Sequence, residues 1–298
     1  MNWIFPLMVV VASSSYGILS TIIKVAMGNG FTVSESVSSQ YIVGFFLALI
    51  LALVTQRQLP KLTKDGVITL VLAGLFTGTT GVVYGQSLVY LPASLAVVML
   101  FQFTWIGLLI DCVLKRRLPT RAETISLVFL VSGTLLAAGV IGADISNIAW
   151  QGWAYGLFSA LSFAIFIQIN SRPVEGMTNI TRLLLLSFVA AVGTSLVLSP
   201  EIIWNGRLFV DGLWKYGLML GFFGIILPIT LFGIAIPKIG GALASILSAM
   251  ELPVAIMASV IVLGEHLTSL QLTGIVLVLI GMTLPTYISM YKAKRLAG

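Results

Sequence analysis

Glu251 is the residue whose position in this sequence most clearly implies chemistry. It is the tenth residue of a predominantly apolar stretch, residues 242–263. At about 1.5 Å per helical residue this stretch can cross a hydrocarbon core of about 30 Å, which places Glu251 near the membrane midplane. A carboxylate at that depth is costly unless it is neutral, paired or facing water, and such acids usually mark ion or substrate pathways. Glu251 is therefore predicted to bind a cationic group or a proton.

The neighbours of Glu251 predict a polar lining on one face of this helix. Pro253 has no amide hydrogen, so the carbonyl of Ala249 is left without its usual helical donor. Spacings of three and four residues align Ser245, Ser248, Glu251, Ala255 and Ser259. We expect the two serines Ser245 and Ser248 to bind substrate together with Glu251, and Pro253 to let the helix bend. The alternative is a protonated packing residue, hydrogen-bonded to a neighbouring helix.

Other polar and aromatic side chains lie at mid-membrane depth in other apolar stretches. Those predicted to share a substrate cavity with Glu251 are Tyr16, Tyr84, Gln102, Trp105 and Gln168. Together with Glu251, and with further polar groups at the same depth, they would form a partly polar, aromatic-lined vestibule for a small amphipathic solute. Each one alone is better explained by an interhelical hydrogen bond than by contact with a substrate. The same depth also holds Gln40, Tyr41, Gln86 and Ser162.

Glycines at spacings of three and four residues predict close helix packing. They are Gly74, Gly78, Gly81 and Gly85 in one stretch, and Gly217, Gly221 and Gly224 in another. Small residues let helix backbones approach one another in lipid. The alternative is that these helices slide or bend, because Pro228 deprives the carbonyl of Gly224 of its donor. The predicted gating or hinge residues are Gly78, Gly224, Pro228 and Pro253.

The elements that position these residues are membrane helices. Of the 298 residues 58% are hydrophobic and only 9% are charged, against roughly 25% charged in soluble domains. The mean hydropathy is +1.09. The pI near 9.6 raises the question of nucleic acid, but the basic residues lie in short loops and are read as topology signals, so no nucleic-acid partner is expected. One cysteine, Cys112, excludes an intramolecular disulfide.

Ten apolar stretches can be marked. They are residues 3–27, 34–55, 66–89, 93–114, 121–141, 149–170, 180–198, 212–236, 241–263 and 270–290. The predicted fold class is an all-α integral membrane protein with ten transmembrane helices.

The distribution of lysine and arginine predicts the orientation. With the N-terminus inside, 13 of the 16 basic residues fall in cytoplasmic segments, and Arg207 and Lys215 fall outside. Both termini are therefore expected in the cytoplasm, with the protein in the inner, cytoplasmic membrane. Asp111, beside Lys115, is expected to form a solvated ion pair at the cytoplasmic interface.

An internal symmetry divides the chain into residues 1–145 and 146–298. Residues 92–118 align without a gap on 241–267, which places Gln102 opposite Glu251. Each half then contains five helices, and because five is odd the two repeats are inverted relative to each other. Secondary transporters are often built in this way, with the binding site at the midplane between the repeats.

Catalytic motifs are missing from the sequence. It contains no H-E-x-x-H, G-x-S-x-G or Walker A motif, and His266 is its single histidine. The protein is therefore not expected to be an enzyme and needs no cofactor. Any energy would come from an ion gradient, with proton coupling through Glu251 as one possibility.

Several short motifs carry a family resemblance. They are Ser15-Tyr16-Gly17, Pro92-Ala-Ser-Leu-Ala96, Glu251-Leu-Pro253, Leu263-Gly-Glu-His-Leu-Thr268, Gln271-Leu-Thr-Gly274 and Gly281. The chain resembles the drug/metabolite transporter superfamily, specifically the EamA-type ten-helix bacterial transporters. The resemblance implies two inverted five-helix repeats, a central cavity, and export of amino acids, other metabolites or drugs across the inner membrane.

The leading hypothesis is a secondary transporter that exports small metabolites such as amino acids by alternating access. Its partners would be a small-molecule substrate and the lipid bilayer, and it would act as a monomer or a homodimer. Two alternatives remain: a flippase for a lipid-linked group, and a membrane scaffold or sensor that transports nothing.

Overall fold

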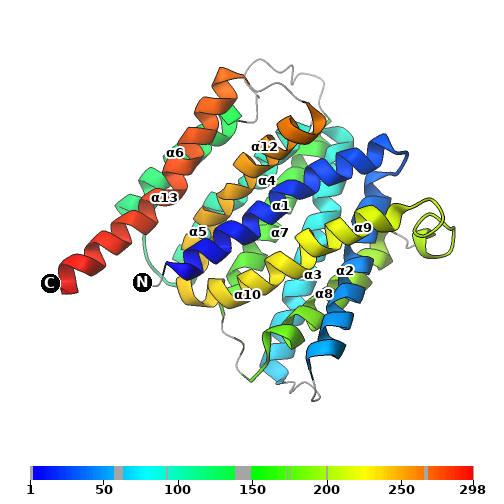
Figure 1. Ribbon diagram of the computed structural model, residues 1–298. Coiled ribbons are helices and arrows are strands. Elements are labelled where there is room, and N and C mark those ends of the chain that lie inside the picture. Colours follow the sequence, from blue (N-terminus) through cyan, green and yellow to red (C-terminus); the bar gives the residue numbers. More distant parts are fainter. Residues whose placement is uncertain are drawn as a thin grey trace.

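A computed structural model describes residues 3–56, 63–91, 93–137, 149–172, 174, 176–198, 201–264 and 268–297. The regular structure of these residues is helical throughout (Figure 1). The elements are α1 (Ile4–Gly28), α2 (Val33–Thr55), α3 (Lys64–Tyr90), α4 (Ala93–Phe101), α5 (Phe103–Leu114), α6 (Arg121–Ala137), α7 (Trp150–Asn170), α8 (Asn179–Leu198), η1 (Glu201–Ile203), α9 (Leu213–Gly221), η2 (Phe222–Ile226), α10 (Leu227–Ile239), α11 (Gly241–Leu247), η3 (Ser248–Met250), α12 (Glu251–Leu263) and α13 (Ser269–Ala297). Glu265, His266, Arg57 and Lys61 lie outside the described residues.

The predicted apolar stretches coincide with these helices to within a few residues, with two exceptions. The stretch 121–141 is longer than α6, and the stretch 270–290 is longer than the apolar part of α13 at its C-terminal end. Eight helices in the described part of the chain are long and apolar enough to cross a membrane, and α4 with α5 counts as one of them. The apolar part of α13, Ser269–Pro285, is shorter. The all-α membrane architecture is thus confirmed, whereas the arrangement as ten helices in two repeats stays a prediction.

Two of the apolar stretches are interrupted where proline predicts it. The π-helical segment η2 directly precedes α10, whose second residue is Pro228. The 3-10 segment η3 directly precedes α12, whose third residue is Pro253. In both places the helical hydrogen-bond pattern changes in the turn before a residue that cannot donate.

A third interruption, at Gln102 between α4 and α5, involves no proline. The amide N–H of Gln102 donates to the carbonyl of Met99 at 3.2 Å, three residues back instead of four. The side-chain amide of the same residue donates to the carbonyl of Val98 at 2.9 Å. The side chain of Gln102 therefore makes the hydrogen bond to this carbonyl that its main-chain N–H no longer makes. The carbonyl keeps a donor, as an apolar surrounding requires.

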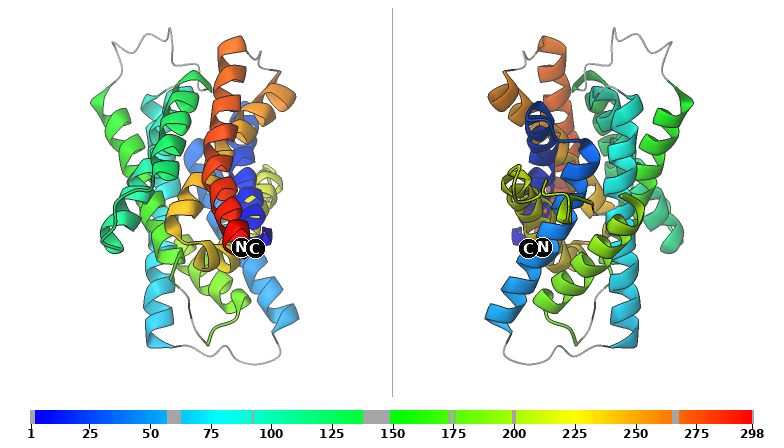
Figure 2. Two further views of the ribbon diagram at one scale, coloured as in Figure 1. Left: turned by 90° about the vertical axis from the view of Figure 1, so that its left-hand side faces the viewer. Right: turned by 90° about the vertical axis from the view of Figure 1, so that its right-hand side faces the viewer.

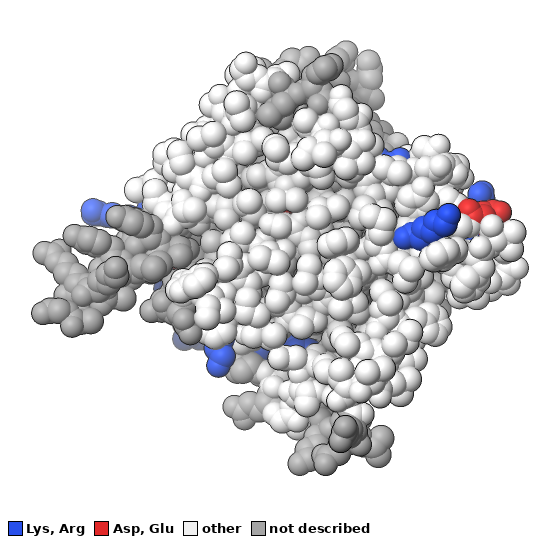
Figure 3. All heavy atoms as spheres, viewed as in Figure 1, with Lys and Arg blue, Asp and Glu red and all other residues white. Residues whose placement is uncertain are grey.

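The helices pack in pairs around α1 and α3. α1 packs on α10 and α12, α3 on α7 and α8, and α2 on α8 and α9. α6 and α13 lie side by side along one flank of the bundle and pack mainly on each other (Figures 1 and 2). The face that contains α1, α9, α10 and α12 is almost free of charged side chains, which gather toward its edges (Figure 3). That distribution suits a surface in contact with lipid.

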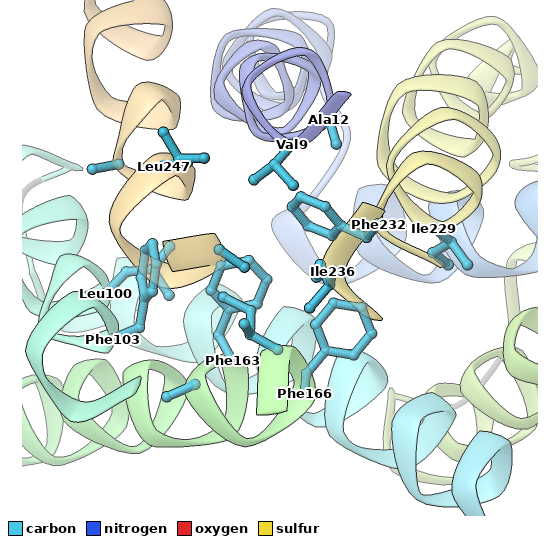
Figure 4. Close-up of a cluster of buried hydrophobic side chains, with 14 of the residues drawn as sticks. Val9, Ala12, Leu100, Phe103, Phe163, Phe166, Ile229, Phe232, Ile236 and Leu247 are labelled. Atoms are coloured by element: carbon cyan, nitrogen blue, oxygen red, sulfur yellow. The ribbon is translucent and has the colours of Figure 1, made fainter. Parts of the chain in front are cut away.

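An aromatic layer fills the centre of the bundle, formed by Phe103, Phe163, Phe166 and Phe232 (Figure 4). The ring centroids of Phe103 and Phe163 are 4.8 Å apart and those of Phe166 and Phe232 are 6.4 Å apart, within the range of favourable aromatic pairs. Val9 and Ala12 of α1 are also fully buried in this cluster. The bundle is therefore filled by side chains here, one to two helical turns before Tyr16 along α1.

Two charged residues are more buried than the sequence suggested. The Asp111 side chain is 1% exposed and forms ion pairs of 2.8 Å with both Lys115 and Arg117, so the expected solvated pair is wrong. Arg117 also binds Glu123 at 2.9 Å, and these hydrogen bonds raise the pKa of Arg117. The network ties the end of α5 to the start of α6.

Arg182, one of the 13 basic residues that the topology prediction places in cytoplasmic segments, is buried inside the bundle. Its Nη2 donates to Oδ1 of Asn170 at 2.6 Å, and its Nη1 donates to the carbonyl of Gly233 at 3.3 Å. A Cβ at Gly233 would lie only 3.3 Å from the Arg182 side chain, so this glycine leaves the slot that the arginine occupies. Arg182 joins α7, α8 and α10 instead of facing solvent.

The pairing of α6 with α13 predicts the effect of a single methyl group. A Cβ at Gly274 would collide with the main chain of Ala137 and lie 2.6 Å from the carbonyl oxygen of Gly133. We expect Gly274→Ala to lower the free energy of unfolding by about 1–3 kcal/mol, because the two backbones must move apart. Thermal unfolding of the detergent-solubilised protein measures this. The control is Gly193→Ala in α8, where the new methyl group meets only Leu75 at 3.7 Å. Equal stability of the two variants would contradict the close packing.

Candidate functional site

A cavity of about 100 Å³ surrounds Glu251 at mid-depth in the bundle. One buried water needs about 10–15 Å³ of such space, so the inner cavity has room for several waters or a small polar group. Its walls come from α1, α2, α3, α4, α7 and α12. The polar side chains among them are Tyr16, Ser20, Gln40, Tyr41, Thr77, Thr80, Tyr84 and Glu251.

A second cavity of about 240 Å³ adjoins the first and shares Ser20, Ile23, Tyr84, Val97 and Ala255 with it. This outer cavity continues toward the end of the bundle that carries the α1–α2 turn, since Lys24, Met27 and Gln271 also line it. At the opposite side of Tyr16 lies the aromatic layer. The combined space is therefore asymmetric: it extends toward the α1–α2 end and is filled by Phe side chains in the other direction.

Glu251 reaches the cavity because α1 passes very close to the start of α12. A Cβ at Gly17 would lie 2.5 Å from the carbonyl oxygen of Glu251 and 2.9 Å from the amide nitrogen of Ala255. Only glycine allows this approach. It brings Tyr16, the preceding residue on α1, and the first residue of α12 into the walls of one cavity.

Two further glycines create the space for the polar side chains of α2. A Cβ at Gly81 of α3 would lie 2.5 Å from the Tyr41 hydroxyl, which donates to the carbonyl of Thr77 at 2.7 Å. A Cβ at Gly224 of η2 would lie 2.5 Å from Nε2 of Gln40. These glycines of the predicted packing motifs thus help to position side chains of the inner cavity.

Three of the predicted substrate-binding residues, Tyr16, Tyr84 and Glu251, line the inner cavity together. Gln102 and Trp105 line neither cavity. They bind each other instead, since Nε1 of Trp105 donates to Oε1 of Gln102 at 2.7 Å. Their role in substrate binding stays a prediction. The structure does not place them with Glu251 in the wall of the inner cavity.

The remaining predicted residues gather at a second junction, between α5, α7 and α11. Gln168 donates to the carbonyl of Gly107 at 2.7 Å and packs against Gly241. Ser245 packs against Gly107, and neither it nor Ser248 lines the inner or the outer cavity. The prediction that these serines share one helix face with Glu251 assumed one continuous α-helix. The 3-10 segment η3 rotates the residues before it relative to those after it, so the two serines leave the face of Glu251.

The hydroxyl groups of Ser245 and Ser248 are fully buried and have no hydrogen-bond partner among the described residues. Both lie in or beside the interruption of the ninth apolar stretch. An unpaired buried hydroxyl costs free energy, which makes this part of the helix less stable than its ends.

The four predicted hinge residues have distinct surroundings. Gly78 packs closely on α8, where a Cβ would lie 3.3 Å from Cγ2 of Thr194. Gly224 lies within η2, and Pro228 and Pro253 are buried in the first turns of α10 and α12. The helix geometry around Gly224, Pro228 and Pro253 is irregular, and the hinge role of these residues stays a prediction.

The predicted site omitted Ser20, Thr77, Thr80 and Phe163, which line the inner cavity, and it placed Gln40 and Tyr41 in the vestibule without naming them as binding residues. Gln40 and Tyr41 carried a signal in their mid-membrane depth. Thr77, Thr80, Gly81 and Tyr84 carried another, because spacings of three, four and seven residues place them on one helix face. Some of the glycines of α3 lie on the same face. Their interpretation as packing residues did not predict that this face lines a cavity.

A bundle of long apolar helices of this kind defines a class, the polytopic membrane proteins. Residues 150–287 match the EamA-like transporter family. The chain therefore contains an EamA-like transporter domain, part of the drug/metabolite transporter superfamily, and is a multi-pass membrane protein.

The whole chain is also similar in fold to a solved structure titled "Crystal structure of protein". The match covers 100% of both chains with a TM-score of 0.76 at 14% sequence identity. At this identity the likeness concerns the fold alone. A comparison with curated protein sequences found no match.

The close contact of α1 with α12 predicts the effect of Gly17→Ala. The new methyl group would meet the main chain of Glu251 and Ala255, which cannot yield without separating the helices. We expect a solute exchange rate in proteoliposomes at least about tenfold lower, because the cavity walls are no longer in register. The control is Gly28→Ala near the end of the same helix, where nothing lies within 4 Å of the new Cβ. Normal exchange by Gly17→Ala would contradict the role of this contact.

Proposed function

We propose that this protein is a secondary transporter that exports small amphipathic metabolites, amino acids or related compounds, across the cytoplasmic membrane. The observation that supports this most directly is the position of Glu251. The carboxylate lies at mid-depth, in a cavity whose walls combine α1–α4 with α7 and α12. Within the described part of the chain, no lysine or arginine forms an ion pair with it. A buried acid beside open space is suited to bind a cationic group or a proton.

The proposal includes ten membrane helices in two inverted repeats, residues 1–145 and 146–298, with both termini in the cytoplasm. The helix interruptions support it. α5 begins directly after Gln102, and α12 begins at Glu251, the residue that the internal alignment pairs with Gln102. The two interruptions use different chemistry, a side-chain amide in one case and a 3-10 segment before proline in the other. They nevertheless fall at matching places.

Alternating access would then require the aromatic layer to open. With both termini inside, the outer cavity leads toward the external face, and Phe163 and Phe232 separate Tyr16 from the cytoplasmic side. Their centroids lie 5.8 Å and 5.9 Å from that of Tyr16. Phe232 is carried by α10, directly after the π-helical segment η2 and Pro228. A bend at η2 would move Phe232 away from Tyr16, which gives the predicted hinge a defined task.

Export, as opposed to import, is proposed from the resemblance to EamA-type transporters. The coupling of transport to a proton gradient is proposed from Glu251 itself. A carboxylate that binds the substrate and a proton alternately links movement of the solute to movement of protons. Tyr16 and Tyr84 would contribute aromatic surface to the bound solute.

Removing the charge of Glu251 tests the proposal. In proteoliposomes that contain the full chain, counterflow of a mixed metabolite pool should occur with the natural protein. Glu251→Gln should abolish the dependence of transport on a pH gradient, because the amide cannot carry a proton. The control is Asp65→Asn, the same chemical change on an exposed side chain in the first turn of α3.

Two results would contradict the proposal in different ways. Unchanged transport and unchanged pH dependence in Glu251→Gln would remove the coupling role of the acid. No counterflow by the natural protein would favour a membrane scaffold or sensor.

A further inference from the structure

The turn between α5 and α6 contains basic residues and no acidic ones. Its four cations are Lys115, Arg116, Arg117 and Arg121. The two acids that flank the turn are both engaged by it, since Asp111 binds Lys115 and Arg117 at 2.8 Å each and Glu123 binds Arg117 at 2.9 Å. Glu123 also accepts from the main-chain N–H of Thr120 at 2.7 Å. Both carboxylates are therefore occupied within this network.

The other two cations of the turn, Arg116 and Arg121, have no such counter-ion. Both are exposed, and neither forms an ion pair with a described residue. Arg116 lies directly after α5, and Arg121 is the first residue of α6. The pairing of Arg117 with Glu123 closes the turn between these two helix ends. The turn thus presents two guanidinium groups to its surroundings.

The main chain of Arg116 has a conformation that favours glycine. Its φ is +49°, the one positive φ of a non-glycine residue in the described part of the chain. The N–H of Arg117 donates to the carbonyl of Cys112 at 2.9 Å and that of Arg116 to the carbonyl of Val113 at 3.2 Å, a helix ending in which glycine is usual at the left-handed position. α12 ends on such a glycine, Gly264, with φ +69°. A side chain kept at this position despite its cost points to a function for the guanidinium.

Exposed apolar side chains adjoin the two cations. Leu118 in the turn is 87% exposed, and Val113 and Leu114 at the end of α5 are 75% and 58% exposed. Val113 and Leu114 are also the last residues of a candidate membrane span, Ala96–Leu114, so their exposed side chains face lipid. The turn that follows directly therefore lies where the apolar core of the bilayer ends and the lipid phosphates begin.

We propose that the α5–α6 turn is a binding site for an anionic phospholipid. Arg116 and Arg121 would bind the phosphate oxygens, for which a guanidinium offers several N–H donors, and Leu118 would contact the acyl chains. A zwitterionic head group fits less well, because its own cation would meet a turn whose neighbouring carboxylates are occupied. The inference concerns the lipid around the protein and does not depend on which solute is transported.

Lipid binding to the purified full-length protein in detergent tests the proposal, with native mass spectrometry as the readout. Dioleoyl phosphatidylglycerol should bind at least about fivefold more tightly than dioleoyl phosphatidylcholine. Arg116→Gln and Arg121→Gln should each lower the affinity for phosphatidylglycerol about fivefold, the contribution of one basic residue near an anionic lipid surface. The control is Lys64→Gln, which removes an exposed cation beside Asp65 at the start of α3 and should leave the affinity unchanged.

Arg116→Gly separates the side chain from the main chain it strains. Glycine adopts a positive φ without cost, so in detergent alone this variant should unfold at a higher temperature than the natural protein. Added phosphatidylglycerol should raise the unfolding temperature of the natural protein more than that of Arg116→Gly. A weaker response in a variant that is the more stable one without lipid does not come from a failure to fold.

Three outcomes would overturn the inference, each at a different point. Equal affinity for phosphatidylglycerol and phosphatidylcholine would remove the selection for negative charge. Unchanged binding of phosphatidylglycerol by the double variant Arg116→Gln with Arg121→Gln would remove the site from this turn. Glycerol phosphate has the same charged group without acyl chains and should not raise the unfolding temperature; equal stabilisation by it would identify a site for a soluble anion instead of a lipid.

Discussion

The structure depends on one constraint: a carboxylate has to be held at mid-depth in an apolar bundle with space beside it. Two features of the main chain satisfy this constraint. The helix that carries Glu251 changes to 3-10 geometry just before that residue, and Gly17 lets α1 lie directly against its main chain. The acid is therefore at the beginning of a helical segment and in contact with a second helix. The cavity walls from α1 and α12 follow from that single contact.

Glycines in this protein serve two purposes that their spacing does not distinguish. Gly78 allows α3 to approach α8, which is the packing role expected of small residues in lipid. Gly81, Gly224 and Gly233 instead leave room for the side chains of Tyr41, Gln40 and Arg182. In the second role a glycine on one helix determines where a polar group of another helix can lie. The polar interior is thus positioned largely by residues that have no side chain.

Hydropathy was sufficient to predict the helices, and proline the interruptions before Pro228 and Pro253, because both signals are local. The break at Gln102 could not be predicted in this way. Its side-chain amide replaces the missing main-chain hydrogen bond, but glutamine is equally common in an unbroken helix. The site was predicted in part. Tyr16, Tyr84 and Glu251 meet, but Ser245 and Ser248 do not follow, because a 3-10 segment of three residues redirects one side of a helical stripe. Asp111 likewise became buried through Arg117, a partner six residues away.

A comparison of the two buried charges explains why only one of them marks a site. Arg182 occupies a slot that Gly233 leaves, and its guanidinium donates to Asn170 and to a main-chain carbonyl, while its buried Nε has no hydrogen-bond partner among the described residues. Burial of a charge with such neutral partners joins helices. Glu251 has an open cavity beside it, and the hydroxyl hydrogens of Ser20, Tyr41 and Thr80 in the cavity wall are already donated elsewhere. A buried acidic group with open space beside it can admit a ligand, whereas a buried charge held in a slot between helices joins them, and this difference distinguishes a candidate binding site from a structural charge.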